Sequence, residues 1–274
     1  MNLRTFFFIL SFLTISNFSF AQGKIGRAED SLKDADEQSS NSESNSNSFD
    51  FSSSDDALFG NIFAELFGRF FFEAFRGVFI ELPDEKQPFL TAYPYAELGN
   101  GNYSNNWNDT STNWRGAITI KYISESSRIK GGHLNFDFKL NDKLAIELDY
   151  LQLWERSSIY ENDQLAIYNA FFKYNRIRTK HFNAFWGIGP TFVDGAVDEI
   201  GISYAIGAEV FPIKPISFET SFNQTFINRS TLNRFQGYMN YHLKQYRFQV
   251  GYEYLKIGSQ KFSNIGLGVG LYFN

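Results

Sequence analysis

From residue 114 to residue 273 the chain alternates apolar and polar residues with a period of two. In one segment the apolar residues Leu134, Phe136, Phe138 and Leu140 alternate with the polar residues His133, Asn135, Asp137 and Lys139. Because successive side chains of a strand point to opposite faces, this pattern predicts amphipathic β-strands. Ten such segments occur, at residues 114–122, 133–140, 144–155, 164–174, 181–192, 201–211, 216–226, 234–243, 246–255 and 263–273.

Strands of about ten residues with one apolar and one polar face, joined by tight turns on one side, are typical of a transmembrane antiparallel β-barrel. The apolar face carries aromatic residues near strand ends, as an interfacial girdle requires: Trp114, Tyr122, Tyr150, Trp154, Tyr174 and Tyr246. A water-soluble barrel of the lipocalin kind would instead turn its apolar face inward, and ten strands of large aromatics would overfill that lumen. We therefore predict about ten strands in a membrane, or twelve if residues 89–98 pair with a further segment.

The last strand ends in the sequence Gly-Val-Gly-Leu-Tyr-Phe at residues 268–273. This resembles the C-terminal assembly signal of Gram-negative outer-membrane barrel proteins, with Gly268, Leu271 and Phe273 at the characteristic positions and Asn274 after the aromatic residue. The resemblance implies insertion by the outer-membrane assembly machinery, a location in the cell outer membrane and lipid as the surroundings. It implies no particular activity, because this fold serves many functions.

The N-terminal region divides into four expected parts. Residues 1–21 read as a signal peptide, with Arg4 before an apolar run and Ser19-Phe20-Ala21 as a cleavage site. Residues 22–56 are rich in Ser, Asn and acidic residues, which predicts a disordered linker. Residues 57–80 predict an amphipathic helix whose phenylalanines would dock on a partner or a membrane: Phe59, Phe63, Phe67, Phe71 and Phe75. Residues 81–113 form an irregular connector with a possible edge strand, and residues 114–274 form the barrel.

Composition narrows the chemistry. The chain has no cysteine, which excludes disulfides, thiolate metal sites and cysteine nucleophiles. Its net charge of −5 belongs to the linker, since residues 57–274 carry 21 acidic and 21 basic residues. No basic surface suggests binding to nucleic acid. The sequence gives no sign of a cofactor or a metal site.

The polar face of the strands predicts what fills the lumen. Six basic and six acidic residues fall on it, together with three histidines: Arg115, Lys121, Lys139, Lys173, Arg234, Arg247, Asp137, Glu147, Asp149, Glu209, Glu219, Glu253, His133, His181 and His242. Equal numbers of each sign favour a network of ion pairs that fills a small barrel, because open channels need more strands.

Known barrel enzymes resemble one another in short motifs that this chain lacks. Outer-membrane acyl hydrolases carry His-x-Ser, and outer-membrane proteases with ten strands carry Asp-x-His; neither occurs here. An enzyme is therefore not expected. The leading hypothesis is a structural or accessory component of an envelope complex, which docks through residues 29–98 to a periplasmic or outer-membrane protein. A small pore gated by the N-terminal helix and a lipid-directed enzyme remain as alternatives.

Overall fold

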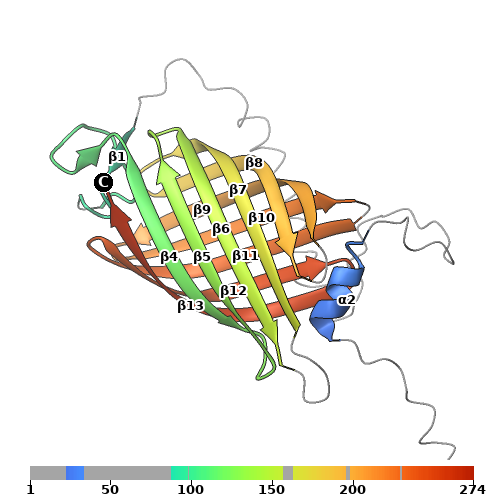
Figure 1. Ribbon diagram of the computed structural model, residues 1–274. Helices are drawn as coiled ribbons and strands as arrows, with labels where there is room; N and C mark the ends of the chain where they lie inside the picture. The colour runs from blue at the N-terminus through green and yellow to red at the C-terminus, as the bar shows by residue number, and fades with distance from the viewer. Residues whose placement is uncertain (1–22, 34–87, 98, 157–162, 196–197, 229) are drawn as a thin grey trace, which may run out of the picture.

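The computed structural model describes residues 23–33, 88–97, 99–156, 163–195, 198–228 and 230–274. Ten antiparallel strands close into a barrel (Figure 1): β4 (Arg115–Ser124), β5 (Ile129–Lys139), β6 (Leu144–Glu155), β7 (Asp163–Arg178), β8 (Phe182–Asp194), β9 (Glu199–Ile213), β10 (Ile216–Ile227), β11 (Ser230–Leu243), β12 (Tyr246–Ile257) and β13 (Gln260–Phe273). β13 pairs with β4 and completes the ring. The prediction of ten strands is confirmed, and the alternative of twelve is wrong.

The two ends of the barrel differ in the length of their connections. At one end, which also holds the C-terminus, strands are joined by residues 140–143, 179–181, 214–215 and 244–245. At the other end the connections are residues 125–128, 156–162, 195–198, 228–229 and 258–259. Outer-membrane barrels have their shorter turns on the periplasmic side. We therefore call the end with the C-terminus the inner mouth and the opposite end the outer mouth.

The outward face of the barrel is apolar and exposed. On this face Ile120 is 59% exposed, Ile202 66% and Leu267 60%, whereas the inward residues Thr119 and Ser203 are almost completely buried. Water would drive such a continuous apolar surface to aggregate. The surface instead matches the apolar belt that a barrel presents to lipid, and the predicted direction of the alternation is confirmed.

Aromatic side chains cluster on the outward face toward both ends of the strands. Tyr168 packs against Tyr150 and Phe192 with ring centroids 4.8 and 6.1 Å apart. Near the inner mouth, the Trp114 ring lies 5.6 Å from that of Phe138, and Phe273 packs nearby. Amphipathic rings favour the boundary between lipid and water, so the two groups mark the two membrane interfaces.

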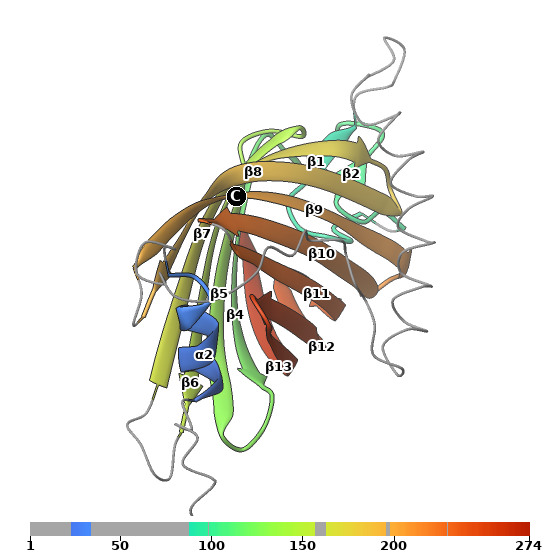
Figure 2. The ribbon, with the colours of Figure 1, turned by 90° about the vertical axis from the view of Figure 1, so that its right-hand side faces the viewer.

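Two short segments from the N-terminal region lie at opposite mouths (Figures 1 and 2). Helix α2 (Lys24–Asp30) sits at the outer mouth, among the connections between barrel strands. At the inner mouth, β1 (Phe89–Thr91) pairs with β2 (Tyr103–Ser104) and β3 (Ser111–Thr112) in a separate three-stranded sheet. β1 falls where an edge strand was expected, but it is the central strand of its sheet.

Helix α2 lies inside the range 22–56 that the composition assigned to a disordered linker. In the α2 segment, which comprises α2 and the turn that follows it (residues 23–33), the apolar residues Ile25, Ala28 and Leu32 recur at helical spacing and are fully buried. This burial outweighs the polar composition around them. The signal peptide, the rest of the linker and the Phe-rich segment 57–80, with its five proposed docking phenylalanines, lie outside the described residues. In the part of the chain that the structure describes, every helix is too short or too polar to cross a membrane.

Candidate functional site

The lumen is the candidate functional site, and a folded segment covers its inner mouth. Tyr103 is buried and its hydroxyl donates to the Asp142 carbonyl oxygen at 3.0 Å, while the Tyr95 hydroxyl donates to the Ile216 carbonyl oxygen at 2.5 Å. Burial, with a smaller contribution from Glu209, raises the pKa of Tyr95 to about 12. Both tyrosines therefore remain neutral hydrogen-bond donors that fasten residues 88–113 onto the turns of the barrel.

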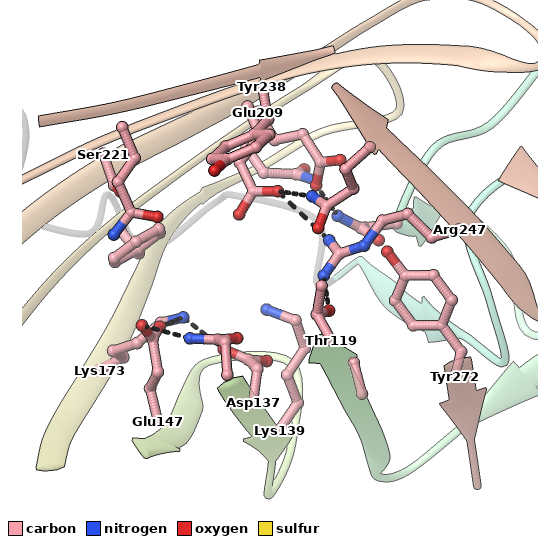
Figure 3. A pocket seen from close by; sticks show the side chains of 18 of the residues that line it. Thr119, Asp137, Lys139, Glu147, Lys173, Glu209, Ser221, Tyr238, Arg247 and Tyr272 are labelled. Carbon is pink, nitrogen blue, oxygen red and sulfur yellow. Dashed lines mark hydrogen bonds and ion pairs between the residues drawn. The ribbon is translucent and has the colours of Figure 1, made fainter. Parts of the chain in front are cut away.

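A polar cavity of about 90 Å³ lies above this inner segment (Figure 3). Lys173 reaches across its floor and binds Asp137 and Glu147, with 2.5 Å between Lys173 Nζ and Glu147 Oε2. On the opposite wall Arg247 donates to Thr119 Oγ1 at 2.5 Å and lies 3.3 Å from Glu219 Oε2. Charged groups line the cavity on several sides, and most of them are bound to one another.

The middle of the lumen is blocked by a buried ionic cluster around Arg234. Its guanidinium lies 2.6 Å from Asp149 and 3.0 Å from Glu253, and all three side chains are at most 2% exposed. The His133 ring lies between the same two carboxylates, with Nδ1 2.7 Å from Glu253 and Nε2 bonded to Asp149. Buried charges are tolerated only when each has partners, and here every member of the cluster has at least two.

Lys121 and Tyr238 extend this cluster toward the cavity. Lys121 Nζ lies 3.5 Å from Glu253 and 4.3 Å from the centre of the Tyr238 ring, and the Tyr238 hydroxyl donates to Glu253 at 2.6 Å. The wall makes room through glycine. A Cβ at Gly266 would lie 2.3 Å from the Tyr238 hydroxyl oxygen, and one at Gly268 would lie 2.5 Å from Lys121 Cγ. The inward glycines of β13 therefore let large side chains approach the wall.

Hydroxyl groups fill the next level toward the outer mouth. Thr191, Ser203 and Thr225 are completely buried and form a chain of hydroxyl–hydroxyl bonds, with 2.7 Å between Ser203 Oγ and Thr225 Oγ1. Thr191 also donates to Asn169 Oδ1 at 2.6 Å, and Asn169 in turn donates to Asp149. The polar network therefore runs without a break from the ionic cluster to the outer third of the barrel.

An apolar collar surrounds the outer third of the lumen. Twelve buried side chains of the barrel strands form it: Ile123, Ile129, Leu151, Leu153, Leu165, Ile167, Val193, Ile227, Leu232, Leu255, Ile257 and Phe262. The three apolar residues of the α2 segment join the same cluster. Each fully buried aliphatic side chain stabilises this packing by about 1.5–3 kcal/mol. Apolar side chains of the described residues thus fill the lumen near the outer mouth.

Four polar contacts hold the α2 segment over the collar. Lys24 Nζ lies 2.5 Å from Glu125 Oε1, and the Ile25 backbone N–H donates to Glu155 Oε2 at 2.8 Å. At its other end the Asn228 side chain donates to the Leu32 carbonyl oxygen at 3.0 Å, and Ser230 donates to the Ser31 carbonyl oxygen. Glu155 of β6 and two side chains of the β10–β11 hairpin therefore bind backbone groups at the two ends of this segment, and Glu125 of the β4–β5 turn binds the Lys24 side chain.

The structure brings fourteen of the fifteen residues predicted for the lumen onto the inward face. His181 is the exception, because it lies in the turn before β8 and is exposed at the inner mouth. The others lie at three levels. Next to the inner segment are Arg115, Glu209 and His242. At the cavity are Lys139, Asp137, Glu147, Lys173, Glu219 and Arg247, and in the Arg234 cluster are Lys121, His133, Asp149, Arg234 and Glu253.

Ser217 and His242 lie within hydrogen-bond distance of each other, as the serine and histidine of a hydrolase do. Ser217 Oγ lies 2.8 Å from His242 Nε2, but it also lies 2.6 Å from Glu209 Oε1. A hydroxyl has one proton, and the carboxylate competes with the imidazole for it. Ser217 is completely buried, and the Tyr95 and Phe211 rings both pack against the His242 imidazole. The pair therefore lacks the arrangement of an activated serine, which needs an accessible hydroxyl bonded to the imidazole alone.

Metal binding finds no support in the described residues. Within the described ranges, no group of three or more histidine or carboxylate side chains has the arrangement that would hold a metal ion. The carboxylates nearest to His133 are occupied by Arg234 and Lys121. The cluster is neutralised by its own basic side chains.

The three residues of the assembly-signal resemblance lie on β13, which closes the barrel against β4. Phe273 is outward and packs beside Trp114 and Phe136, and Leu271 pairs with Ile118 across the closing seam. Gly268 faces the lumen beneath Lys121. The last strand thus combines an outward aromatic end with an inward face of glycines.

Sequence reasoning missed the apolar collar. A signal was present, because near the outer ends of the strands both parities become apolar, as in the run Tyr150-Leu151-Gln152-Leu153-Trp154 and in the pair Phe226-Ile227. Such a loss of alternation indicates a strand that is apolar on both faces. Its partner, a helix from the far N-terminal region, gave no comparable sign.

Comparison with solved structures gives small outer-membrane barrels. The chain is similar to the outer membrane protein OprG from Pseudomonas aeruginosa, with 13% identity over 60% of this chain and 97% of that one and a TM-score of 0.33. Ail, the attachment invasion locus protein of Yersinia pestis, is 15% identical over 59% of this chain and 100% of that one, with a TM-score of 0.32. The NanC porin is 12% identical over 58% of this chain and 99% of that one, with a TM-score of 0.36. No family model and no curated protein matches the chain. Its own closed ring of strands, apolar outside and charged inside, makes it an outer-membrane-type β-barrel.

Proposed function

We propose that this chain is a non-conducting outer-membrane barrel with a structural or accessory role in the cell envelope. The observation that supports the proposal is that described residues occupy the lumen or its mouths at three levels: the β1–β3 segment, the Arg234 cluster and α2 in the apolar collar. An ion that crossed the lumen would have to separate buried ion pairs, at a cost of several kcal/mol, and displace α2.

The accessory role rests on surfaces outside the membrane. The segment at the inner mouth carries Trp107, which is 56% exposed and packs edge-on against Phe89 at 5.5 Å. Exposed tryptophans are frequent anchors of protein interfaces. This supports docking of a protein partner at the inner mouth, beside residues 88–97 at the end of the proposed docking range 29–98. The start of that range does not fit the proposal, because residues 29–33 are held at the outer mouth.

Conductance in planar lipid bilayers tests the closure. We expect the full chain to give no steady conductance steps. We also expect a variant with Ile25→Asp and Leu32→Asp, which expels α2 from the collar, to remain closed because the Arg234 cluster still fills the middle level. Arg27→Asp, on the exposed face of the same helix, is the matched control. A steady unit conductance of the full chain would contradict the proposal and favour the small pore.

Purification in mild detergent, followed by mass spectrometry of what accompanies the protein, tests the accessory role. We expect a stoichiometric companion with the full chain and its loss or depletion with Trp107→Ser. An exposed control on the same segment is Asp109→Ser. A chain that purifies alone in every form would contradict the accessory role while leaving the closed lumen intact.

A further inference from the structure

Two buried basic side chains face each other across neighbouring strands at the inner end of the lumen. Arg115 on β4 and Lys139 on β5 are directly opposite in the register, and both point inward. They are only 3% and 9% exposed. Like charges at directly opposite positions destabilise a sheet, and burial strengthens their repulsion because little water is left to screen it.

Their hydrogen-bond partners are neutral. Arg115 donates to the Thr91 carbonyl oxygen at 3.0 Å and to Asn102 Oδ1 at 2.8 Å, and Lys139 Nζ donates to Asn175 Oδ1 at 3.0 Å. Among the described residues, neither side chain has a carboxylate oxygen within 4.0 Å. The repulsion between the two is therefore not relieved by a direct ion pair.

The carboxylates that line the same cavity are engaged elsewhere. Asp137 and Glu147 both bind Lys173, and Glu219 pairs with Arg247 at 3.3 Å. Lys139 thus has no carboxylate of the described residues in direct contact, although Asp137 and Glu209 act on its charge at longer range and its Nζ lies 5.9 Å from the centre of the Tyr103 ring.

The fourth carboxylate, Glu209, is linked through an amide to only one of the two basic groups. Asn102 Nδ2 donates to Glu209 at 2.9 Å while Asn102 Oδ1 accepts from Arg115, so the amide links these two charges. Lys139 has no such link, since its one hydrogen-bond partner is Asn175. Within the part of the chain that the structure describes, Lys139 is therefore the basic group of the pair that has neither a carboxylate in contact nor an amide link to one.

Space for a counterion lies beside this group. The Lys139 side chain extends into the cavity of about 90 Å³ (Figure 3), and Arg247 Nε, also at the cavity, has no hydrogen-bond acceptor among the described residues. A single water needs about 10–15 Å³ of such volume, so the cavity has room for an ion together with several waters.

We propose that this cavity binds one small anion of halide size between Lys139 and Arg115. A single-atom anion fits better than a carboxylate or phosphate group. Both terminal nitrogens of Arg115 already donate to neutral oxygens, which obstructs the two-pronged contact that guanidinium groups make with oxyanions. This inference does not depend on the proposed function, because the two facing basic groups and the cavity beside them would be the same in an open or a closed barrel.

Thermal unfolding of the detergent-solubilised full chain tests the site. A ligand that binds the folded state alone raises its stability as the ligand concentration increases. We expect the unfolding temperature to be higher in sodium chloride than in sodium gluconate at equal ionic strength, because gluconate is too large for the cavity. Equal unfolding temperatures in the two salts at all concentrations would overturn the proposal.

The variant Lys139→Met removes the charge and keeps the length of the side chain. We expect it to lose the difference between chloride and gluconate. Lys130→Met is the matched control, because Lys130 lies on the same strand but is exposed at the outer end, and it should keep the difference. A chloride-specific stabilisation that persists in Lys139→Met would place the anion elsewhere and contradict the site.

Crystals of the unaltered protein grown or soaked in bromide give a result even if the variant fails to fold. Bromide scatters anomalously and replaces chloride. We expect an anomalous peak inside the cavity, between Lys139 Nζ and the Arg115 guanidinium. Bromide peaks confined to the protein surface would refute the proposal.

Discussion

The inner two thirds and the outer third of the lumen are built from the same ten strands but filled in opposite ways. The inner part holds a network of charges, in which the Arg234 side chain by itself contacts three others, Asp149, Glu253 and His133. The outer part is an apolar collar occupied by Ile25, Ala28 and Leu32 of the α2 segment. In both parts the inward residues follow the same alternation, so the barrel wall dictates the direction of a side chain but not its chemistry.

The two kinds of filling should respond differently to the loss of one side chain. An ionic network stabilises the fold only while every charge keeps its partners, and one deletion leaves several groups unpaired. Apolar packing has no such directional requirement, and losing one contact costs about the free energy of that contact. Substitutions in the two regions should therefore differ in size and in reach.

The largest effect is expected for Arg234→Met. It leaves the Asp149 and Glu253 carboxylates buried without their guanidinium, which costs about 3–5 kcal/mol of unfolding free energy. The measurement is urea unfolding of the barrel in lipid vesicles. Arg128→Met, on the exposed β4–β5 turn, is the control and should cost about 0–1 kcal/mol. If Arg234→Met costs no more than this control, the cluster does not stabilise the fold as described.

Leu32→Ala should have a smaller and local effect. Truncating a buried leucine costs about 2–5 kcal/mol, and we expect about 2 kcal/mol here because the short α2 segment can detach without unfolding the barrel. Hydrogen exchange should show faster opening of the α2 amides with little change in the strands. Arg128→Ala, on the exposed β4–β5 turn, should leave the exchange of the α2 amides unchanged. Accelerated exchange throughout the strands would show that the collar is not a separable unit.

Two glycine substitutions compare the lumen with the lipid face. At Gly268 a new Cβ would lie 2.5 Å from Lys121 Cγ, and we expect Gly268→Ala to cost about 1–2 kcal/mol by overpacking. At Gly237 the nearest atom, in Phe235, would be 3.6 Å away, so Gly237→Ala should be close to neutral. Equal unfolding free energies for the two variants would mean that the lumen is looser than its packing indicates.

The smallest effect is expected at the inner mouth and depends on pH. Hydrogen bonds from Ser104, Asn100 and Asn108 lower the pKa of Glu97 below its usual 4.5. Because the folded-state pKa is lowered, the ionised carboxylate stabilises this loop above about pH 4.5, and the contribution disappears as the pH falls through the lowered pKa. Hydrogen exchange of residues 99–113, corrected for intrinsic rates, should show weaker protection in acid. Glu97→Gln should remove this pH dependence, and its persistence would assign the effect to another group.

Most of the barrel was predictable from the sequence because a membrane imposes a strict period of two on its strands. The segments expected at 144–155, 216–226 and 246–255 coincide with β6, β10 and β12 to within two residues. The parity also placed Arg234, Asp149 and Glu253 on one face. It did not predict which of them meet, because contacts across a lumen depend on the stagger of the whole ring.

The closures of the two mouths were less predictable. Tyr95 and Tyr103 bind carbonyl groups of turns that lie more than 35 positions away in the chain, and local sequence carries no record of such pairings. The α2 segment looked like the start of a polar linker, since the collar that buries Ile25 and Leu32 comes from residues far along the chain. Tertiary burial here overrode the local composition.

The most direct test of the account asks whether the two N-terminal segments close opposite mouths. The chain has no cysteine, so Arg27→Cys on α2 and Asp109→Cys at the inner mouth each introduce one exposed thiol. Cells that carry either variant in their outer membrane are treated with a maleimide too large and too polar to cross it. We expect the Arg27→Cys variant to react in intact cells and the Asp109→Cys variant to react only after the membrane is permeabilised. Labelling of Asp109→Cys but not of Arg27→Cys in intact cells would contradict it.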